Sequence, residues 1–179
     1  MKALVAFSLC SAFGCTTSTT NVNDGAIIAG TPFTAVGAVS MVRTNRGLTN
    51  IMLGDFADVC SVADESEHAT SKSLTLLLSD FTGADESTPP MHAGTYPVSS
   101  LVGPLPTSGP YAECGFQVTD GTCRLTETPC TSGEITLTRA DATGYAGSFD
   151  VVIAGDHVAG NFDTANCANV SEDGFGTCH

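Results

Sequence analysis

The sequence predicts an all-β domain, an antiparallel β-sandwich or barrel stapled by disulfides, and three observations support this. From about Ala26 onward, short apolar stretches alternate with Gly, Pro, Asn and Asp, and several stretches alternate apolar and polar residues. Charged residues make up only 14% of the chain while glycine and threonine are abundant, a composition that suits strands better than helices. Eight cysteines in 179 residues are typical of a protein that forms disulfides in an oxidising compartment.

The alternation predicts ten strands. Leu74, Leu76 and Leu78, for example, share one face of their strand because successive side chains of a strand point to opposite sides. Residues 61–71 are expected to form a helical turn or a polar loop, and residues 103–110 a loop with three prolines. The predicted strands cover residues 26–29, 35–43, 50–54, 73–81, 94–99, 114–119, 122–128, 133–139, 145–154 and 157–163.

Two dipeptides predict hairpin turns. Gly155 and Asp156, taken as a two-residue turn, pair the flanking strands so that their apolar residues share one face. Asp120 and Gly121 predict a second hairpin in the same way. The predicted pairs are Ile153–Val158, Val151–Gly160 and Phe149–Phe162 for the first hairpin, and Val118–Cys123 and Phe116–Leu125 for the second.

A glycine stands two residues before an aromatic residue at three places in the predicted strands, ending at Tyr96, Phe149 and Phe162. Glycine inside a strand marks a sharp bend or a place where another group approaches the bare backbone. We therefore expect these rings to cover the backbone of a neighbouring strand or the strands to bend there.

The N-terminus has the pattern of an export signal. Lys2 supplies one positive charge, and the apolar run over residues 3–13 is too short to span a bilayer as a helix. Residues 12–15, Ala-Phe-Gly-Cys, resemble the lipobox of bacterial lipoproteins, with Ala12 at the position where leucine is usual. The resemblance implies cleavage before Cys15 and attachment of diacylglycerol to its thiol.

The resemblance divides the chain into a signal peptide over residues 1–14, a polar, Thr-rich flexible tether over 15–25 and a single β-rich domain over 26–179. Thr16 follows the lipidated cysteine, and in this family a residue other than Asp there implies the outer membrane. A secreted or periplasmic protein is the alternative location. The later stretches "GTYPV", "SGEITLT", "GSFDV" and "GNFDTANC" also resemble predicted bacterial lipoproteins of unknown function.

The number of cysteines supports cleavage before Cys15. With Cys10 removed and Cys15 acylated, six cysteines remain and all of them can pair, whereas ordinary cleavage after Ala12 would leave seven. Six cysteines allow fifteen connectivities. Among these we prefer Cys60–Cys167, which joins the first and last thirds of the domain, with Cys114–Cys130 and Cys123–Cys178.

No motif in the sequence indicates catalysis, a metal site or a cofactor. The chain has no C-x-x-C pair and no G-x-S-x-G turn. The spacing of the four histidines is not that of paired metal ligands; these residues are His68, His92, His157 and His179. Six basic against 19 acidic residues give a net charge of −13, which disfavours nucleic acid as a partner because its phosphates would be repelled.

These observations predict a membrane-anchored envelope lipoprotein whose β-domain binds an unidentified ligand or has a structural role. The membrane is its one predicted partner, reached through the lipid on Cys15. An exported hydrolase with a site assembled from loops such as 103–110 and 64–71 is one alternative. A disulfide-stapled inhibitor or adhesin is another.

Overall fold

The computed structural model describes residues 25–43, 47–57, 59–60, 70–81, 91–99, 106 and 108–167. The described residues form eleven β-strands, and residues 59–60 alone among them are helical, so the predicted all-β fold is confirmed. The strands are β1 (Ala26–Ile28), β2 (Thr31–Phe33), β3 (Gly37–Arg43), β4 (Leu48–Gly54), β5 (Lys72–Asp80), β6 (Gly94–Pro97), β7 (Pro110–Thr119), β8 (Leu125–Asp141), β9 (Gly144–Ile153), β10 (Asp156–Asp163) and β11 (Ala165–Asn166).

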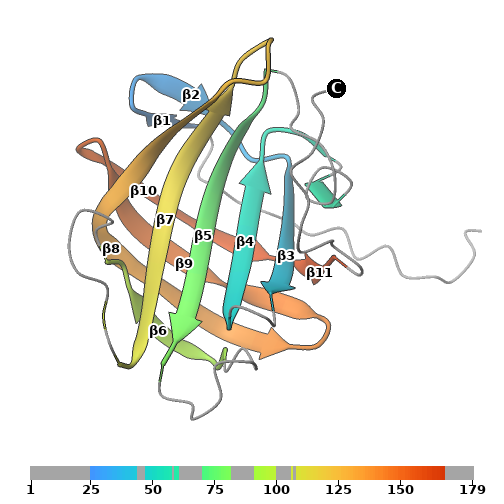
Figure 1. Ribbon diagram of the computed structural model, residues 1–179, viewed down its shortest axis with the longest axis vertical. Coiled ribbons are helices and arrows are strands. Elements are labelled where there is room, and N and C mark those ends of the chain that lie inside the picture. Colours follow the sequence, from blue (N-terminus) through green and yellow to red (C-terminus); the bar gives the residue numbers. More distant parts are fainter. Residues whose placement is uncertain are drawn as a thin grey trace, which may run out of the picture.

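Nine of these strands form one sheet that folds over on itself (Figure 1). Its order is β10-β9-β8-β7-β5-β4-β3-β11, and β6 also pairs with β8. The sheet bends over along β8. The first residues of this strand pair with β7, and the remainder pair with β9. Register shifts between Cys130 and Ser132 and between Leu137 and Arg139 interrupt this second pairing, and such bulges bend a strand.

The segment after β10 joins the two halves of the sheet at the other side. β11 pairs with β3 in parallel, whereas the other strand pairs named above are antiparallel. Thr164 donates a backbone hydrogen bond to the Tyr145 carbonyl, and Cys167 donates one to the Ser40 carbonyl. The Ser40 hydroxyl in turn donates to the Asn166 side chain at 2.6 Å. The chain therefore crosses from β9 to β3 and links the sheet halves opposite the β8 bend.

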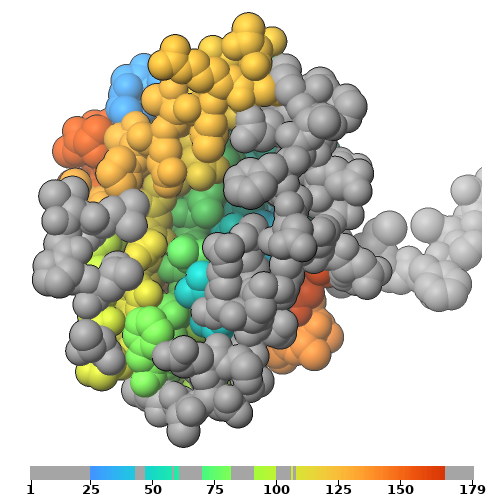
Figure 2. Space-filling model, viewed as in Figure 1, coloured from blue at the N-terminus to red at the C-terminus, as the bar shows by residue number. Residues whose placement is uncertain are grey.

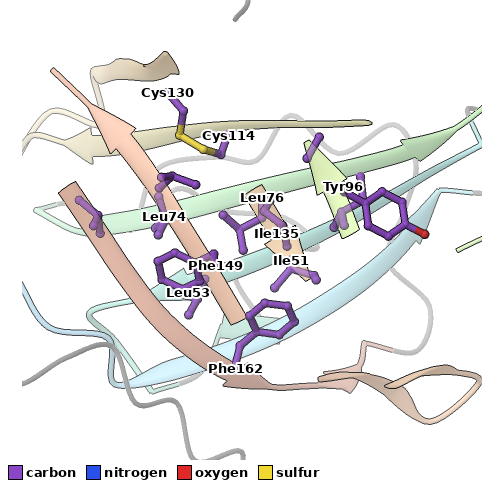
Figure 3. Close-up of a cluster of buried hydrophobic side chains, with 14 of the residues drawn as sticks. Ile51, Leu53, Leu74, Leu76, Tyr96, Cys114, Cys130, Ile135, Phe149 and Phe162 are labelled. Carbon is purple, nitrogen blue, oxygen red and sulfur yellow. A yellow bond between two sulfur atoms is a disulfide. The ribbon is translucent and has the colours of Figure 1, made fainter. Parts of the chain in front are cut away.

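Apolar side chains fill the space between the two halves (Figure 3). Leu74, Leu76 and Leu78 are fully buried, as their alternation predicts. The short β1–β2 hairpin closes one end with Ile28 and Phe33, and the Phe33 ring packs edge-on against Phe116. The interior is thus a packed core, and its other large members include Ile51, Leu53, Tyr96, Ile135, Leu137, Phe149, Val151, Ile153, Val158 and Phe162.

Three strands differ from the predicted set. The predicted strands at 122–128 and 133–139 are parts of the single strand β8, because a bulge between Cys130 and Ser132 lies where a loop was expected. β2 and β11 were not predicted, since each has only two or three residues and β2 contains Pro32, a residue that strands disfavour.

The predicted register of the β9–β10 hairpin is wrong by two residues. Ala154 and Gly155 form the turn, with φ angles of 52° and 90°, and Asp156 is the first residue of β10. Positive φ at both turn residues suits the right-handed twist of a tight hairpin. A shift of two residues keeps each side chain on its predicted face, so the buried and exposed sets stay as predicted.

The predicted register of the β7–β8 hairpin is wrong by three residues. Its loop runs from Asp120 to Arg124, and Thr119 lies opposite Leu125. The Asp120 carboxylate accepts hydrogen bonds from the backbone and hydroxyl of Thr122 and from the backbone of Arg124, and these bonds lower its pKa. The loop is longer than predicted because this carboxylate organises five residues, with Cys123 at φ 59°.

Two of the glycine–aromatic motifs lie opposite each other. Phe149 pairs with Gly160 and Phe162 pairs with Gly147, so each ring faces the glycine of the partner strand. At Gly147, the atoms nearest to the position of a Cβ atom are backbone atoms of Thr136 and Leu137 on β8, so the close approach to this glycine comes from the neighbouring strand.

Candidate functional site

The two disulfides preferred from the sequence are both present. Cys60 is bonded to Cys167 and Cys114 to Cys130, with Cα–Cα distances of 5.6 and 5.3 Å. Cys123 is also disulfide-bonded, and its predicted partner Cys178 lies outside the described residues. All five cysteines in the described part of the chain are therefore oxidised. The predicted lipid-attachment residue, Cys15, lies outside this part.

The Cys114–Cys130 bond is a cross-strand bond inside the core. The β7–β8 register pairs Gly115 with Pro129, so the next residues in line are the two cysteines. Both are almost fully buried, and Figure 3 shows them beside the apolar side chains of the interior. This disulfide fixes β8 just where it leaves β7 and turns toward β9.

The histidines and predicted loops do not come together in the described residues. The backbone of His92 exchanges hydrogen bonds with the Tyr96 hydroxyl, and exposed His157 lies 3.8 Å from the Asp150 carboxylate. His68, His179 and most of the loops 64–71 and 103–110 lie outside the described residues. Within the described ranges, no group of three or more His, Cys, Asp or Glu residues is placed to hold a metal ion.

The outer face of β4, β5 and β7 carries the most distinctive polar surface. Along each strand, alternate side chains point away from the core, and on this face they remain partly or fully buried. Figure 2 shows the face as a recess whose floor is formed by these strands, below the β7–β8 hairpin. We call this surface the outer recess, and its side chains include Asn50, Met52, Ser73, Thr75, Leu77, Tyr111, Glu113, Gln117 and Glu127.

A pair of glutamates lies in the outer recess. Glu113 projects from β7, and the carboxylate of Glu127 on β8 lies over Gly115, where a Cβ atom would collide with it. Glycine at position 115 therefore provides the space that lets Glu127 lean toward Glu113. Partial burial raises the pKa of the Glu113 carboxyl, and the negative charge of Glu127 raises it further.

A small hydrogen-bond cluster lies beside the glutamates. Ser73 and Thr75 on β5 each donate a long hydrogen bond of 3.4 Å to the side-chain oxygen of Gln117 on β7. Both hydroxyls therefore share one acceptor, the amide oxygen of Gln117. Carboxylates, hydroxyls and an amide thus share one recess, a set that can hydrogen-bond a polyhydroxylated ligand or attract a cation.

An aromatic pair lies further along the same face. The Tyr111 and Phe81 rings stack with centroids 5.4 Å apart and planes 21° apart. Burial raises the pKa of the Tyr111 hydroxyl, while its hydrogen bond with Ser79 acts in the opposite direction. Phe81 keeps 40% of its surface exposed, so the pair offers an apolar platform next to the polar recess.

The Glu113 carboxyl provides a test of the charge coupling in the recess. Its pKa is raised in the folded state, so stability falls as pH rises from about 4 through the folded-state pKa. Glu113→Gln removes the ionisation, and we expect the variant to be more stable than the parent at pH 7 by less than about 1 kcal/mol, since the site is partly exposed. Thermal unfolding measured as a function of pH checks this.

Glu127→Gln is the matched variant for this experiment. It removes the charge that acts on Glu113. Compared with the parent, this variant should therefore lose stability over a narrower pH range as the pH rises. A gain from Glu113→Gln that persisted below about pH 3, where both carboxyls are protonated, would contradict charge relief as the cause.

The glutamate pair carries no signal in the sequence that marks it as a site. The alternation in β7 predicts that Glu113 and Gln117 point the same way. The predicted hairpin register, however, places Glu127 opposite Cys114 and on the wrong face, whereas in the structure it lies opposite Gln117.

Comparisons with protein-family models, with curated proteins and with solved structures found no match to this chain. Among the residues that the structure describes, no helix is long and apolar enough to cross a membrane.

Proposed function

We propose that this protein is an exported, lipid-anchored protein of the cell envelope whose β-domain has a binding or structural role. The observation that carries the proposal is the oxidation of all five described cysteines. Cytosolic reductants keep such residues as thiols, so a domain built on disulfides belongs in an oxidising compartment.

The N-terminal sequence supports the lipid anchor. A single lysine, a short apolar run and the lipobox-like residues before Cys15 have the order of a lipoprotein signal. Each acyl CH₂ group buried in the bilayer stabilises attachment by about 0.8 kcal/mol, and more than one chain makes the attachment lasting. Thr16 at the next position favours the outer membrane.

The filled interior supports binding at the outside of the domain. The large side chains of β5, β8, β9 and β10 occupy the space between the sheet halves in the described residues. We therefore place ligand contact on the outer recess, with Glu113, Gln117 and Glu127 as the polar contacts. The alternative of a hydrolase depends on loops 64–71 and 103–110, most of which lie outside the described residues.

Metabolic labelling with a palmitate analogue tests the anchor. We expect the parent protein to be labelled and to sediment with membranes, and Cys15→Ser to lose both properties because its hydroxyl cannot form the thioether. Cys10→Ser is the matched control and should be labelled like the parent, since Cys10 lies in the segment that is removed. Equal labelling of parent and Cys15→Ser, or labelling of neither, would overturn the proposal.

A further inference from the structure

Exposed apolar side chains gather at one end of the domain. Among the described residues, five large hydrophobic side chains are exposed. Three of them lie at the end closed by the β1–β2 hairpin: Ile27, Val36 and Leu125, with 64%, 59% and 42% of their surface exposed. We call this the hairpin end.

The strand pairing places these three residues at the same end. Val36 donates a backbone hydrogen bond to Gly54, the last residue of β4. Lys72 begins β5 and Leu125 begins β8, and both lie beside the end of β7. The Lys72 ammonium donates to the Pro32 carbonyl at 2.9 Å, which holds the β1–β2 hairpin against this end. Figure 1 shows β1, β2 and the β7–β8 loop together at the top of the molecule.

The β1–β2 hairpin has one face toward the core and one toward the outside. Ile28 and Phe33 point into the core and are buried. Ile27 and Pro32, which are paired across the two strands, lie on the other face and are exposed. Ile27 therefore projects outward from the hairpin end.

The predicted anchor enters the domain at this end. Gly25 directly precedes β1, and Cys15 lies ten residues before it. At no more than about 3.6 Å per residue, the lipid-bearing residue stays within about 36 Å of Gly25. The other two exposed hydrophobic residues, Val42 and Phe81, lie at the far ends of β3 and β5.

The carboxylates at the hairpin end accept hydrogen bonds from backbone groups nearby. The carboxylates of Asp55 and Asp156 each accept a backbone hydrogen bond from another segment, and the Asp120 carboxylate accepts one from Arg124 within its own loop. The basic residues Lys72 and Arg124 lie at the same end. Three carboxylates and two basic side chains thus lie at the same end as the three exposed apolar side chains.

We propose that the hairpin end docks on the lipid surface to which the protein is anchored, with Ile27, Val36 and Leu125 in the interfacial region. This inference rests on the proposed lipid anchor, which holds the domain within reach of the bilayer and so raises the effective concentration of the lipid surface. Apolar contact suits the strongly acidic chain, since its net charge of −13 gives no attraction to anionic lipid.

The chain contains no tryptophan, so a single introduced indole reports its own surroundings. The full lipidated protein carrying Ile27→Trp would be reconstituted into vesicles of phosphatidylethanolamine and phosphatidylcholine. Phe81→Trp, at the far end of β5, is the matched control. We expect the indole at position 27 to shift its emission to shorter wavelength and to lose most of it when the phosphatidylcholine carries brominated chains, while the indole at position 81 is not quenched.

A second variant keeps the indole and weakens the contact. Ile27→Trp combined with Leu125→Asp should lose much of the quenching, because the charge opposes burial next to the reporter. Palmitate labelling of the same preparations separates the two proposals. Labelled protein with equal, weak quenching at positions 27 and 81 would overturn docking and leave the anchor intact. Unlabelled protein would overturn both, and a shift that follows protein concentration without bromine quenching would assign the surface to a second copy of the chain.

Discussion

Replacing Cys60 and Cys167 together by serine should lower the free energy of unfolding by about 5 kcal/mol. The bond closes a loop of 107 residues, so its removal releases a large conformational entropy in the unfolded chain. Removal of the bond also weakens the packing of the segment before Cys60 against β3 in the folded protein. Val59 is buried and its side chain lies within 2.8 Å of the point where Gly37 would carry a Cβ atom, so the segment before Cys60 packs closely on β3. Urea unfolding followed by circular dichroism measures the loss.

The Cys114→Ala, Cys130→Ala double variant is the comparison for this prediction. Its loop spans only 16 residues, for which the entropy model gives about 3 kcal/mol. Both sulfur atoms lie in the core, so truncation adds a packing cost. A much larger loss in this variant than in the Cys60–Cys167 variant would contradict chain entropy as the main term. Because small domains have total stabilities of about 5–15 kcal/mol, either variant should unfold at markedly lower urea concentration.

The alternation of apolar and polar residues was enough to predict the core face of most strands. Leu74, Leu76 and Leu78 are buried together, and Phe149 and Phe162 point into the same interior. This information lies in the period of two along each strand and does not depend on which strand is the neighbour. The all-β class followed from the same local patterns, whereas the two disulfides were a preference among fifteen possible connectivities that the structure bears out.

The register of the hairpins could not be predicted, because it depends on turn geometry. At the β9–β10 turn, Ala154 takes a positive φ that alanine rarely adopts, and no local preference points to it. At the β7–β8 turn, the three hydrogen bonds to the Asp120 carboxylate add residues to the loop. The β9–β10 register was wrong by two residues, an even number, so every side chain stayed on its predicted face. The β7–β8 register was wrong by three residues, an odd number, so the predicted face of β8 was reversed.

The three-residue error in the β7–β8 register also concealed the candidate site. Reversal of β8 placed Glu127 toward the core in the predicted hairpin, where a carboxylate would be expensive to bury. In the structure it lies over Gly115 in the outer recess and acts on Glu113. A site on a sheet face requires residues from several strands in the correct register, so sequence patterns in one strand are insufficient to define it.

Gly147→Ala should destabilise the domain by about 3 kcal/mol, at the upper end of the usual cost of overpacking. A Cβ atom at position 147 would run into the Thr136 carbonyl and lie 3.1 Å from the Leu137 Cα, both on the neighbouring strand β8. Backbone atoms of a paired strand cannot rotate away as a side chain can, so β8 and β9 would have to separate locally.

Gly121→Ala is the matched control, because a Cβ atom there meets nothing within 4 Å and the residue is exposed in the β7–β8 loop. We expect its free energy of unfolding to stay within about 0.5 kcal/mol of the parent. Hydrogen exchange locates the damage: in Gly147→Ala the amides of β8, β9 and β10 should exchange faster than in the parent, while those of β3 and β4 should follow only the global loss. Equal stability of the two variants would mean that β8 and β9 do not approach as closely as the structure places them.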